Sequence, residues 1–511
     1  MQLHQAQKIA DELCKATPGE AFRAGISILN ADFAEVLLPA AERLARLHDS
    51  DARISQLLGL AARASGDGPG ALAAFGKAAR LAPNDALIAH SHARAALESG
   101  APSVALFERA SQLAPNDGSV LLGMAASLVA GGRASAAADM LTEKLEQNPL
   151  WIDGYDALAQ IAQQFGIDPL RQLDAALRAN AASVGLHHTR ISILLKARRN
   201  ADALHALRLA QTNIGTQDWM VRLEAHIASE LGDLQAADRL FASASPPTAP
   251  ADLALLARHE LRSGRPALVS DLLETSMSGD RSNLLWPYLS LAWRMLDDPR
   301  HDWLEGDQSL IGIYDLADEY GELADLAGHL RSLHLAIAPP LDQSVRGGTQ
   351  TDGNLLLRDE AAIRKLRTLV LEAVARHVAG LSASRPGHPT LLSNRHPQRI
   401  AGAWSVRLKE SGFHADHVHT SGWLSSAFYV ALPESLGKSG LQGSESPSEH
   451  AGWLSLGECR ELVPGLEPMR LIEPKPGRLV LFPSTMWHGT RSFPSGERIT
   501  AAFDIALPRQ K

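Results

Sequence analysis

Residues 411–430 read SGFHADHVHTSGWLSSAFYV and contain three histidines and an aspartate within six positions, followed by an apolar and aromatic run. Such a run is typical of a buried β-strand. Because residues two apart in a strand point to the same face, His417 and His419 can reach one point in space. His414 and Asp416 can do the same on the opposite face. Histidine pairs of this kind bind iron, zinc or copper, so the stretch predicts a metal site.

A second stretch, residues 476–504, reads PGRLVLFPSTMWHGTRSFPSGERITAAFD. Its pattern predicts a strand, a turn at the Pro-Ser pair, a hairpin loop rich in Gly, Pro and Ser, and a final strand. His488 lies between the turn and the loop. Arg498 follows it by ten residues, and Thr500 lies two further on, on the same face of the final strand.

These motifs together resemble the iron(II)- and 2-oxoglutarate-dependent oxygenases, with a His-x-(Asp or His) pair, a distal histidine and an Arg-x-(Ser or Thr) pair. The strings HVHTSGWLSSAFYVALP and LVLFPSTMWHGTRSFPSGERITAAFD resemble a bacterial branch in which the oxygenase domain follows tetratricopeptide repeats. The resemblance covers roughly residues 340–507. It implies a dioxygenase (hydroxylase) that uses Fe(II) and 2-oxoglutarate.

The resemblance implies that His488 and His417 are catalytic metal ligands, and it leaves the third ligand open. Aligning on the run WLSSAFYV places His417 and His419 at the motif, so that His419 is either a third ligand or lies just behind the metal. A literal His-x-Asp also exists as His414 and Asp416. We prefer His417 and His419 as the ligands that join His488, and we keep His414 and Asp416 as the alternative. In the preferred set, Asp416 is expected to accept the N–H of a ligand histidine.

The resemblance also implies a binding site for the cosubstrate. Arg498 is expected to bind the distal carboxylate of 2-oxoglutarate, because a guanidinium group matches a carboxylate bidentately, and Thr500 is expected to add a hydroxyl hydrogen bond. Tyr429 and Arg407 are weaker candidates for the same site. Arg346, in a QSxRGGTQT-like string, is expected at the substrate entrance.

Length and composition set the class of protein. A chain of 511 residues predicts two or three domains, and 45% hydrophobic with 21% charged residues is typical of soluble globular proteins. A net charge of −8 argues against nucleic acid and anionic membranes as partners. Two cysteines without metal-site spacing, no signal-like N-terminus and no apolar run of about 18 residues predict a cytoplasmic protein.

An internal repeat marks the N-terminal part. Residues 73–85 (AAFGKAARLAPND) are echoed 32 positions later by residues 105–117 (ALFERASQLAPND), a period typical of tetratricopeptide repeats. We predict a helical repeat domain over residues 1–300, clearest at 51–165. A junction and loop follow at 301–354.

The pattern changes to a period of two after an amphipathic helix at residues 355–381. Residues 355–511 are therefore predicted to form a double-stranded β-helix, a jelly-roll barrel, with that helix supporting it. The fold class is multidomain, α followed by α+β. The long loop at 437–452 is expected at the mouth of the barrel, where loops usually determine specificity.

The leading functional hypothesis is hydroxylation of a protein or peptide side chain presented on the concave face of the repeats. An oxygenase acting on a small molecule is an alternative, because a small molecule could enter the same barrel. Another is a non-catalytic adaptor with a degenerate metal-binding barrel, and a third is a cupin-like metal enzyme that does not use 2-oxoglutarate. A dimer is compatible with the sequence.

Overall fold

The computed structural model describes residues 1–280, 282–434, 436 and 450–509. It divides into two compact units, Met1–Glu143 with Asp352–Lys365, and Lys144–Thr351 with Leu366–Lys511. The domain borders predicted at residues 300 and 354 stay predictions. Most of the predicted specificity loop at 437–452 lies outside the described residues. Among the described helices, none combines the length and apolar character needed to cross a bilayer.

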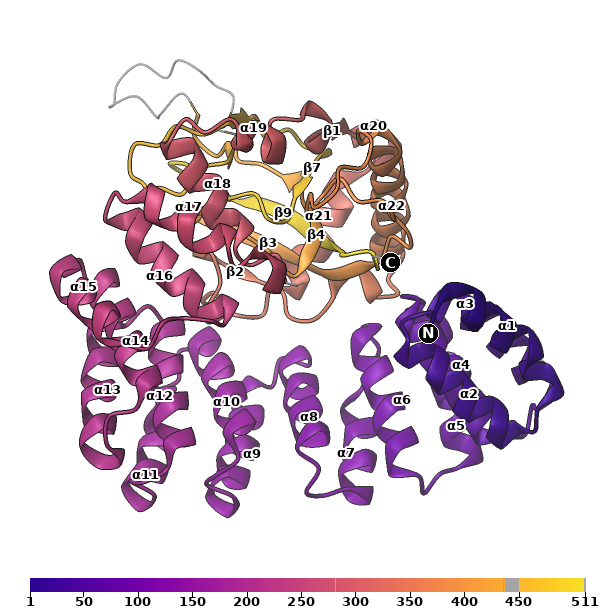
Figure 1. The fold of residues 1–511 in the computed structure, drawn as a ribbon. Helices are drawn as coiled ribbons and strands as arrows, with labels where there is room; N and C mark the ends of the chain where they lie inside the picture. The colour runs from indigo at the N-terminus through magenta and orange to yellow at the C-terminus, as the bar shows by residue number, and fades with distance from the viewer. Residues whose placement is uncertain (281, 435, 437–449, 510–511) are drawn as a thin grey trace. The chain divides into compact units, whose positions relative to one another are not determined.

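Helices follow one another in pairs through most of the chain, and the first helices of successive pairs begin at residues 18, 52, 86, 118, 152, 184, 218, 250 and 286. Figure 1 shows pairs such as α12–α13 and α14–α15 side by side. The spacing of 32 to 36 residues is the predicted period, and it extends beyond the clear copies at 51–165. The predicted N-terminal helical array, similar to tetratricopeptide repeats, is confirmed.

The helices of this array have the following bounds: α1 Leu3–Glu12, α2 Pro18–Asn30, α3 Ala34–Leu47, α4 Ala52–Ala64, α5 Gly68–Leu81, α6 Ala86–Glu98, α7 Val104–Leu113, α8 Gly118–Ala130, α9 Ala134–Gln147, α10 Ile152–Phe165, α11 Arg171–Ala179, α12 Val184–Lys196, α13 Asn200–Ile214, α14 Asp218–Glu230, α15 Leu234–Ser243, α16 Pro250–Arg262, α17 Pro266–Glu274, α18 Trp286–Met295 and α19 Arg300–Glu305. Two short helices, α20 (Ala317–Tyr320) and α21 (Leu323–Leu333), follow. One long helix, α22 (Ala361–Gly380), precedes the main strands.

The repeat motif explains where these helices begin and how they pack. Its final aspartates, Asp85 and Asp117, accept hydrogen bonds from backbone N–H groups in the first turns of α6 and α8. Such a cap satisfies a donor that the helix itself leaves unpaired. Within the first pairs, Gly59 is needed because a Cβ there would lie 2.8 Å from the ring of Phe75.

The C-terminal half contains two antiparallel sheets. A six-stranded sheet has the order β1-β7-β4-β9-β3-β2, and a three-stranded sheet has the order β6-β5-β8. Among the described residues, the two sheets do not join into one closed hydrogen-bonded barrel. The strands are β1 Gly312–Asp315, β2 Val345–Gln350, β3 Ile400–His414, β4 Gly422–Ala431, β5 Leu454–Leu456, β6 Arg470–Ile472, β7 Arg478–Pro483, β8 His488–Thr490 and β9 Arg498–Ala506.

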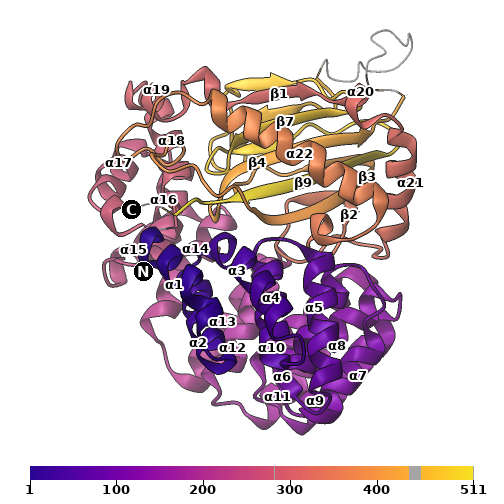
Figure 2. The ribbon, with the colours of Figure 1, turned by 90° about the vertical axis from the view of Figure 1, so that its right-hand side faces the viewer.

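Helix α22 covers one face of the six-stranded sheet, as Figure 2 shows. It begins at Ala361, six residues after the start of the predicted helix, because Leu355–Leu357 forms a 3₁₀ turn. Its apolar side chains are buried at intervals of three or four residues, which is the pattern of a helix packed on a core. The buried positions include Leu366, Val370, Val374 and Val378.

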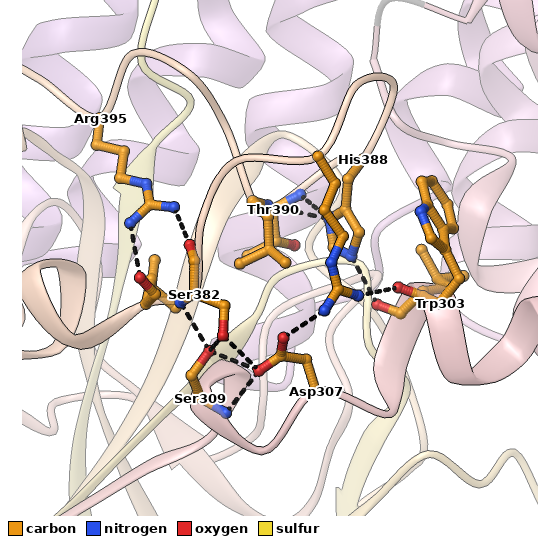
Figure 3. Close-up of polar contacts among 11 residues, drawn as sticks. Trp303, Asp307, Ser309, Ser382, His388, Thr390 and Arg395 are labelled. Atoms are coloured by element: carbon orange, nitrogen blue, oxygen red, sulfur yellow. Dashed lines mark hydrogen bonds and ion pairs between the residues drawn. The ribbon is translucent and has the colours of Figure 1, made fainter.

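A polar network fixes the loop between α22 and β3 (Figure 3). Asp307 Oδ1 accepts hydrogen bonds from the hydroxyls of Ser309 (2.7 Å) and Ser382 (3.1 Å). Nδ1 of His388 accepts the backbone N–H of Thr390 at 3.0 Å. The carbonyl of Thr390 in turn accepts Nε1–H of Trp423 at 2.9 Å. The network therefore holds the start of β4, directly after the histidine-rich stretch.

The segment before β2 lies along two repeat helices of the same unit. Its Ile337 N–H donates to the carbonyl of Gln164 in α10 at 3.0 Å, and its Asp342 N–H donates to the carbonyl of Lys196 at the end of α12 at 3.2 Å. These bonds fix the chain immediately before Ser344. They thereby place that residue beside the histidines described below.

Candidate active site

The two distant histidine motifs meet as a pair of opposed backbone positions. His417 N–H donates to His488 O at 2.9 Å, and His488 N–H donates to His417 O at 3.0 Å. Residues that exchange both hydrogen bonds lie directly opposite each other, with their side chains on the same side. The two imidazole centroids are 4.1 Å apart. A local two-strand pairing therefore joins stretches seventy residues apart in sequence.

His419 completes a cluster of three. It lies two residues after His417, on the same side of the chain, and its backbone N–H donates to Ser484 O at 2.9 Å. Its ring centroid lies 4.9 Å from that of His417 and 5.0 Å from that of His488. One nitrogen from each of the three imidazoles lies within 4.8 Å of the others. Such a set can hold a single metal ion.

Backbone carbonyls fix the tautomers of two of these rings. The Nδ1 atoms of His417 and His488 lie 2.8 Å from Ala415 O and 3.0 Å from Met486 O. A carbonyl only accepts, so each Nδ1 carries the proton and each Nε2 keeps its lone pair. Burial lowers the pKa of both rings well below the ordinary histidine value. Both imidazoles are therefore neutral at pH 7, the form that binds metal.

Asp504, at the end of β9, orients His419. Its Oδ1 lies 2.9 Å from His419 Nδ1 and also accepts the hydroxyl of Ser425 at 2.7 Å. This is the carboxylate–histidine contact that raises the basicity of a ligand and fixes its ring. The expectation that Asp416 accepts a ligand N–H was wrong, since Asp504 is in that position.

Asp416 points away from the cluster and forms an ion pair with Arg460. The guanidinium donates from Nε at 2.8 Å and from Nη2 at 2.7 Å, and the backbone N–H of Arg460 adds a third bond at 2.9 Å. Gly489 is required beside it, because a Cβ there would lie 2.1 Å from Asp416 Oδ1. The alternative pair is thus not brought to one point: His414 stacks on His417 at 6.0 Å between centroids, and Asp416 is already neutralised.

A cavity that is partly open to solvent lies over the three histidines. Both sheets and the segment before β2 line it, with Gln343, Ser344, Gln350, Trp404, Val406, His414, His417, His419, Ser426, Ala427, Leu454, Phe482, His488, Gly489, Thr490, Arg498, Thr500 and Ala502.

Arg498 is the charged residue of this lining, and it is 2% exposed. Its Nη1 donates to Gly452 O at 2.9 Å, and its Cζ lies 5.0 Å from the ring centroid of Tyr429. Its Nε and the Tyr429 hydroxyl are buried without hydrogen-bond partners among the described residues. Burial lowers the pKa of Arg498 and raises that of Tyr429. Thr500, 5% exposed, lines the cavity two residues along the strand.

The other two predicted arginines have different surroundings. Arg407 lies outside the cavity lining and donates from Nε to Glu497 at 2.5 Å, so its prediction as a cosubstrate ligand is not supported by its position. Arg346 donates from Nη1 to the carbonyls of Gln343 at 2.7 Å and Val345 at 2.8 Å. Arg346 is therefore close in the chain to the cavity residue Ser344, but it does not line the cavity itself.

Residues 402–504 match the sequence model of the family described as "Putative 2OG-Fe(II) oxygenase". The C-terminal part of this chain is a domain of the 2OG-Fe(II) oxygenase family. All three clustered histidines, Arg498 and Thr500 lie within the matched range. A comparison with curated proteins finds no match.

Solved structures of two kinds are similar to parts of the chain. A 2OG-Fe(II) oxygenase-family oxidoreductase from Burkholderia pseudomallei is 14% identical, with a TM-score of 0.26, over 39% of this chain and 86% of its own. A Pseudomonas putida prolyl-4-hydroxylase is 13% identical, with a TM-score of 0.26, over 42% and 97%. A tetratricopeptide repeat protein from Parabacteroides merdae is 15% identical, with a TM-score of 0.30, over 48% and 99%.

Several polar residues of this site were not among the predicted site residues, among them Asp504, Ser344 and Gln350. Asp504 contacts His419, as described above. Ser344 Oγ lies 3.0 Å from His414 Nδ1 and 3.2 Å from His417 Nε2, and Gln350 lines the same wall. Asp504 could have been found by alternation, because it shares a strand face with Arg498 and Thr500. Ser344 could not be found in this way, because its position depends on backbone hydrogen bonds between the preceding segment and the repeat helices.

Proposed function

We propose that the oxygenase-family domain is an Fe(II)- and 2-oxoglutarate-dependent dioxygenase. In this proposal His417, His419 and His488 hold the metal, and Arg498 with Thr500 binds the distal carboxylate of 2-oxoglutarate. One observation carries it: three imidazoles converge in the same cavity as a buried arginine whose Nε has no partner among the described residues. A domain with a purely structural role would not need a histidine cluster and a buried arginine in the same cavity.

The donor set fits iron. Imidazole nitrogens are common iron ligands, and two of the three rings are fixed as neutral donors by carbonyls. The set departs from the usual two histidines and one carboxylate, since His419 takes the carboxylate's place and Asp504 stands behind it. The negative charge therefore lies one hydrogen bond away from the metal position. We infer that Asp504 partly compensates for the missing carboxylate ligand.

The fit to 2-oxoglutarate rests on Arg498. A guanidinium buried without an ion-pair partner among the described residues is costly, and a carboxylate ligand offsets that cost. The apolar side chains of Phe482, Leu454 and Val406 line the cavity and exclude water around the bound anion. We further infer that the two sheets, which line the same cavity, are the two halves of a jelly roll.

When bound, iron and 2-oxoglutarate would together supply the oxidising power to insert one atom of dioxygen into a substrate C–H bond, while the other atom enters succinate as 2-oxoglutarate loses carbon dioxide. The residues of this chain bind, orient and exclude water. Arg498 and Thr500 fix one end of the cosubstrate, and the histidine cluster fixes the other. Gln343 is an exposed residue of the lining, so we place the substrate entrance beside it.

We propose a protein or peptide side chain as the substrate, presented by the helical repeats. Support comes from the arrangement of helix pairs at a regular spacing, because arrays of this kind commonly bind extended polypeptides. We propose a cytoplasmic location for the same enzyme. A small-molecule substrate and a non-catalytic adaptor are the outcomes against which the proposal is tested.

The deciding experiment measures succinate formation from 2-oxoglutarate by the purified full-length protein, with and without Fe(II). We expect slow turnover that requires iron and needs no added substrate. Adding short peptides or small metabolites then separates the two substrate classes, because a true substrate accelerates this basal turnover. If iron-loaded protein neither binds nor consumes 2-oxoglutarate, the dioxygenase proposal is wrong and the adaptor function replaces it.

The third ligand is tested by comparing His419→Ala with Asp416→Asn. We expect His419→Ala to weaken iron binding more than 10- to 100-fold, the loss typical of residues that only support a ligand. Asp416→Asn removes the charged partner of Arg460, which is 37% exposed and keeps a longer contact with Glu458 at 3.7 Å, so we expect a loss of about 1–3 kcal/mol in the free energy of unfolding, with iron binding retained. Iron titration and urea unfolding measure the two effects. The reverse pattern would establish Asp416 as the ligand.

A further inference from the structure

Helix α18 of the repeat array contacts the strand that carries His488. Trp487 is 3% exposed, and its Nε1–H donates to the carbonyl of Pro287 in the first turn of α18 at 2.9 Å. Its ring meets that of Tyr288 edge-on, at 6.0 Å between centroids. The residue immediately before a proposed metal ligand is therefore packed on a helix two hundred residues earlier in the chain.

The segment 457–467 contacts both ligand-bearing stretches. Gly457 N–H donates to Trp487 O at 2.7 Å, directly after the register pair Leu456–His488. Three residues later, Arg460 forms its ion pair with Asp416, the residue before His417. The segment thus touches the backbone next to His488 and the side chain next to His417. Its position sets how these two stretches approach each other.

Arg294, in the last turn of α18, holds this segment at two points. Its Nη1 donates to Gly457 O, and its Nη2 donates to Glu467 O at 2.5 Å. No ion pair of Arg294 with a carboxylate is present among the described residues. Its guanidinium is instead used to bind two backbone carbonyls at opposite ends of one segment. The planar guanidinium presents two separate nitrogens to these carbonyls in a fixed geometry, which a single ammonium nitrogen on a flexible stem does not reproduce.

An apolar cluster packs beside this contact, which is partly buried at its Gly457 end and exposed at its Glu467 end. Cys459 and Leu462 of the segment, together with Trp487, belong to the same buried cluster as Leu289 and Trp293 of α18. Hydrogen bonds from a charged donor are stronger than those between neutral groups, and the buried cluster fixes the segment on α18 beside them. The contact is therefore a fixed part of the domain's geometry.

We propose that Arg294 is a positioning residue for the metal centre. By holding the 457–467 segment, it sets the spacing between the His417 and His488 stretches, so that the last repeat helices form part of the catalytic domain. This inference rests on the proposed function, because it takes the three histidines to be metal ligands. It assigns to the repeat array a role within the active site, in addition to binding a partner.

The test compares Arg294→Lys with a matched control, Arg300→Lys, in the full-length protein. Arg300, in the neighbouring helix α19, pairs with Asp298 and Glu274, and within the described part of the chain none of its hydrogen bonds or ion pairs reaches the 457–467 segment. The probe is Co(II), whose visible absorption reports both affinity and coordination geometry. Thermal unfolding of the metal-free protein is measured in parallel, so that a loss of folding is separated from a loss of positioning.

We expect Arg294→Lys to weaken Co(II) binding about 10- to 100-fold, the effect typical of residues that support a metal ligand. The melting temperature of the metal-free variant should stay close to that of the control, and the control should bind Co(II) like the wild type. If Arg294→Lys binds Co(II) as tightly as the wild type, with the same spectrum, the inference is wrong. A lowered melting temperature with unchanged affinity would assign a purely structural role and would equally overturn it.

If Arg294→Lys does not fold, Trp487→Phe tests the same inference. This variant keeps an aromatic ring in the cluster and loses the hydrogen bond to Pro287 O. We expect weaker Co(II) binding in folded protein, and unchanged binding would overturn the inference. If the wild type binds neither Co(II) nor Fe(II), the proposed function fails and this inference fails with it. Metal binding by the wild type with no effect of either variant overturns only the inference.

Discussion

Replacing His488 by alanine should abolish iron-dependent conversion of 2-oxoglutarate to succinate. The imidazole is 6% exposed, its Nδ1 is fixed by Met486 O, and its ring lies 4.1 Å from that of His417. Removing a support residue of a metal ligand typically costs 10- to 100-fold in affinity, so removing the ligand should cost more than about 100-fold. Succinate formation and Fe(II) titration, measured on the same preparation, check the result.

The matched control for this variant is His414→Ala. His414 is partly buried, lines the same cavity and stacks on His417, but it lies outside the cluster of three. Its replacement should leave iron bound. If His414→Ala loses iron and His488→Ala keeps it, the proposed ligand set is wrong. Circular dichroism of both variants excludes unfolding as the cause of either result.

The spacing of residues in the sequence was enough to predict that two of the three clustered histidines share one side of the chain. His417 and His419 are two apart, and the alternation of a strand puts them on one side whatever the rest of the fold does. The pairing of this stretch with His488 depends on register between distant strands, which no local pattern encodes. The family resemblance, not the spacing, predicted that His488 joins these two histidines.

The same alternation separates Arg407 from the cavity. Trp404 and Val406 line the cavity from alternate positions of β3, so the residue between Val406 and Leu408 must point to the other face. Arg407 accordingly pairs with Glu497. Its role as a cosubstrate ligand stays a prediction, and its strand face, which the sequence pattern also indicates, does not support it.

Other parts of the fold could not be predicted from local pattern. Strands β1 and β2 come from the region predicted as a junction, yet they form the two edges of the six-stranded sheet. Short edge strands carry few residues and little alternation, so the hydrogen bonds of a long neighbour decide their conformation. The repeat helices after residue 165 keep their spacing although the consensus residues fade, because packing against neighbouring pairs replaces the motif.

Replacing Arg498 should raise the KM for 2-oxoglutarate far more than it lowers kcat. Truncating one partner of a buried charged pair costs about 2–5 kcal/mol, which corresponds to a rise in KM of roughly 30-fold or more for Arg498→Ala. Arg498→Lys keeps the charge and loses the fork, so its KM should lie between those of the wild type and Arg498→Ala. Arg407→Ala is the control, and its KM should be unchanged. If KM rises only in Arg407→Ala, Arg407 and not Arg498 binds the carboxylate of 2-oxoglutarate.

The burial of Arg498 also predicts how the cosubstrate affects stability. Without a ligand, the domain holds a guanidinium that is 2% exposed and has an unpaired Nε among the described residues, which destabilises the fold. Binding of 2-oxoglutarate relieves this cost, so it should raise the melting temperature of the wild type with increasing ligand concentration. Arg498→Ala should lose this response, and Arg407→Ala should keep it. Because the variant no longer buries an unpaired charge, its ligand-free form should melt no lower than the wild type. Thermal unfolding with and without 2-oxoglutarate measures both effects, and a large ligand-induced shift in Arg498→Ala would show that the carboxylate binds elsewhere.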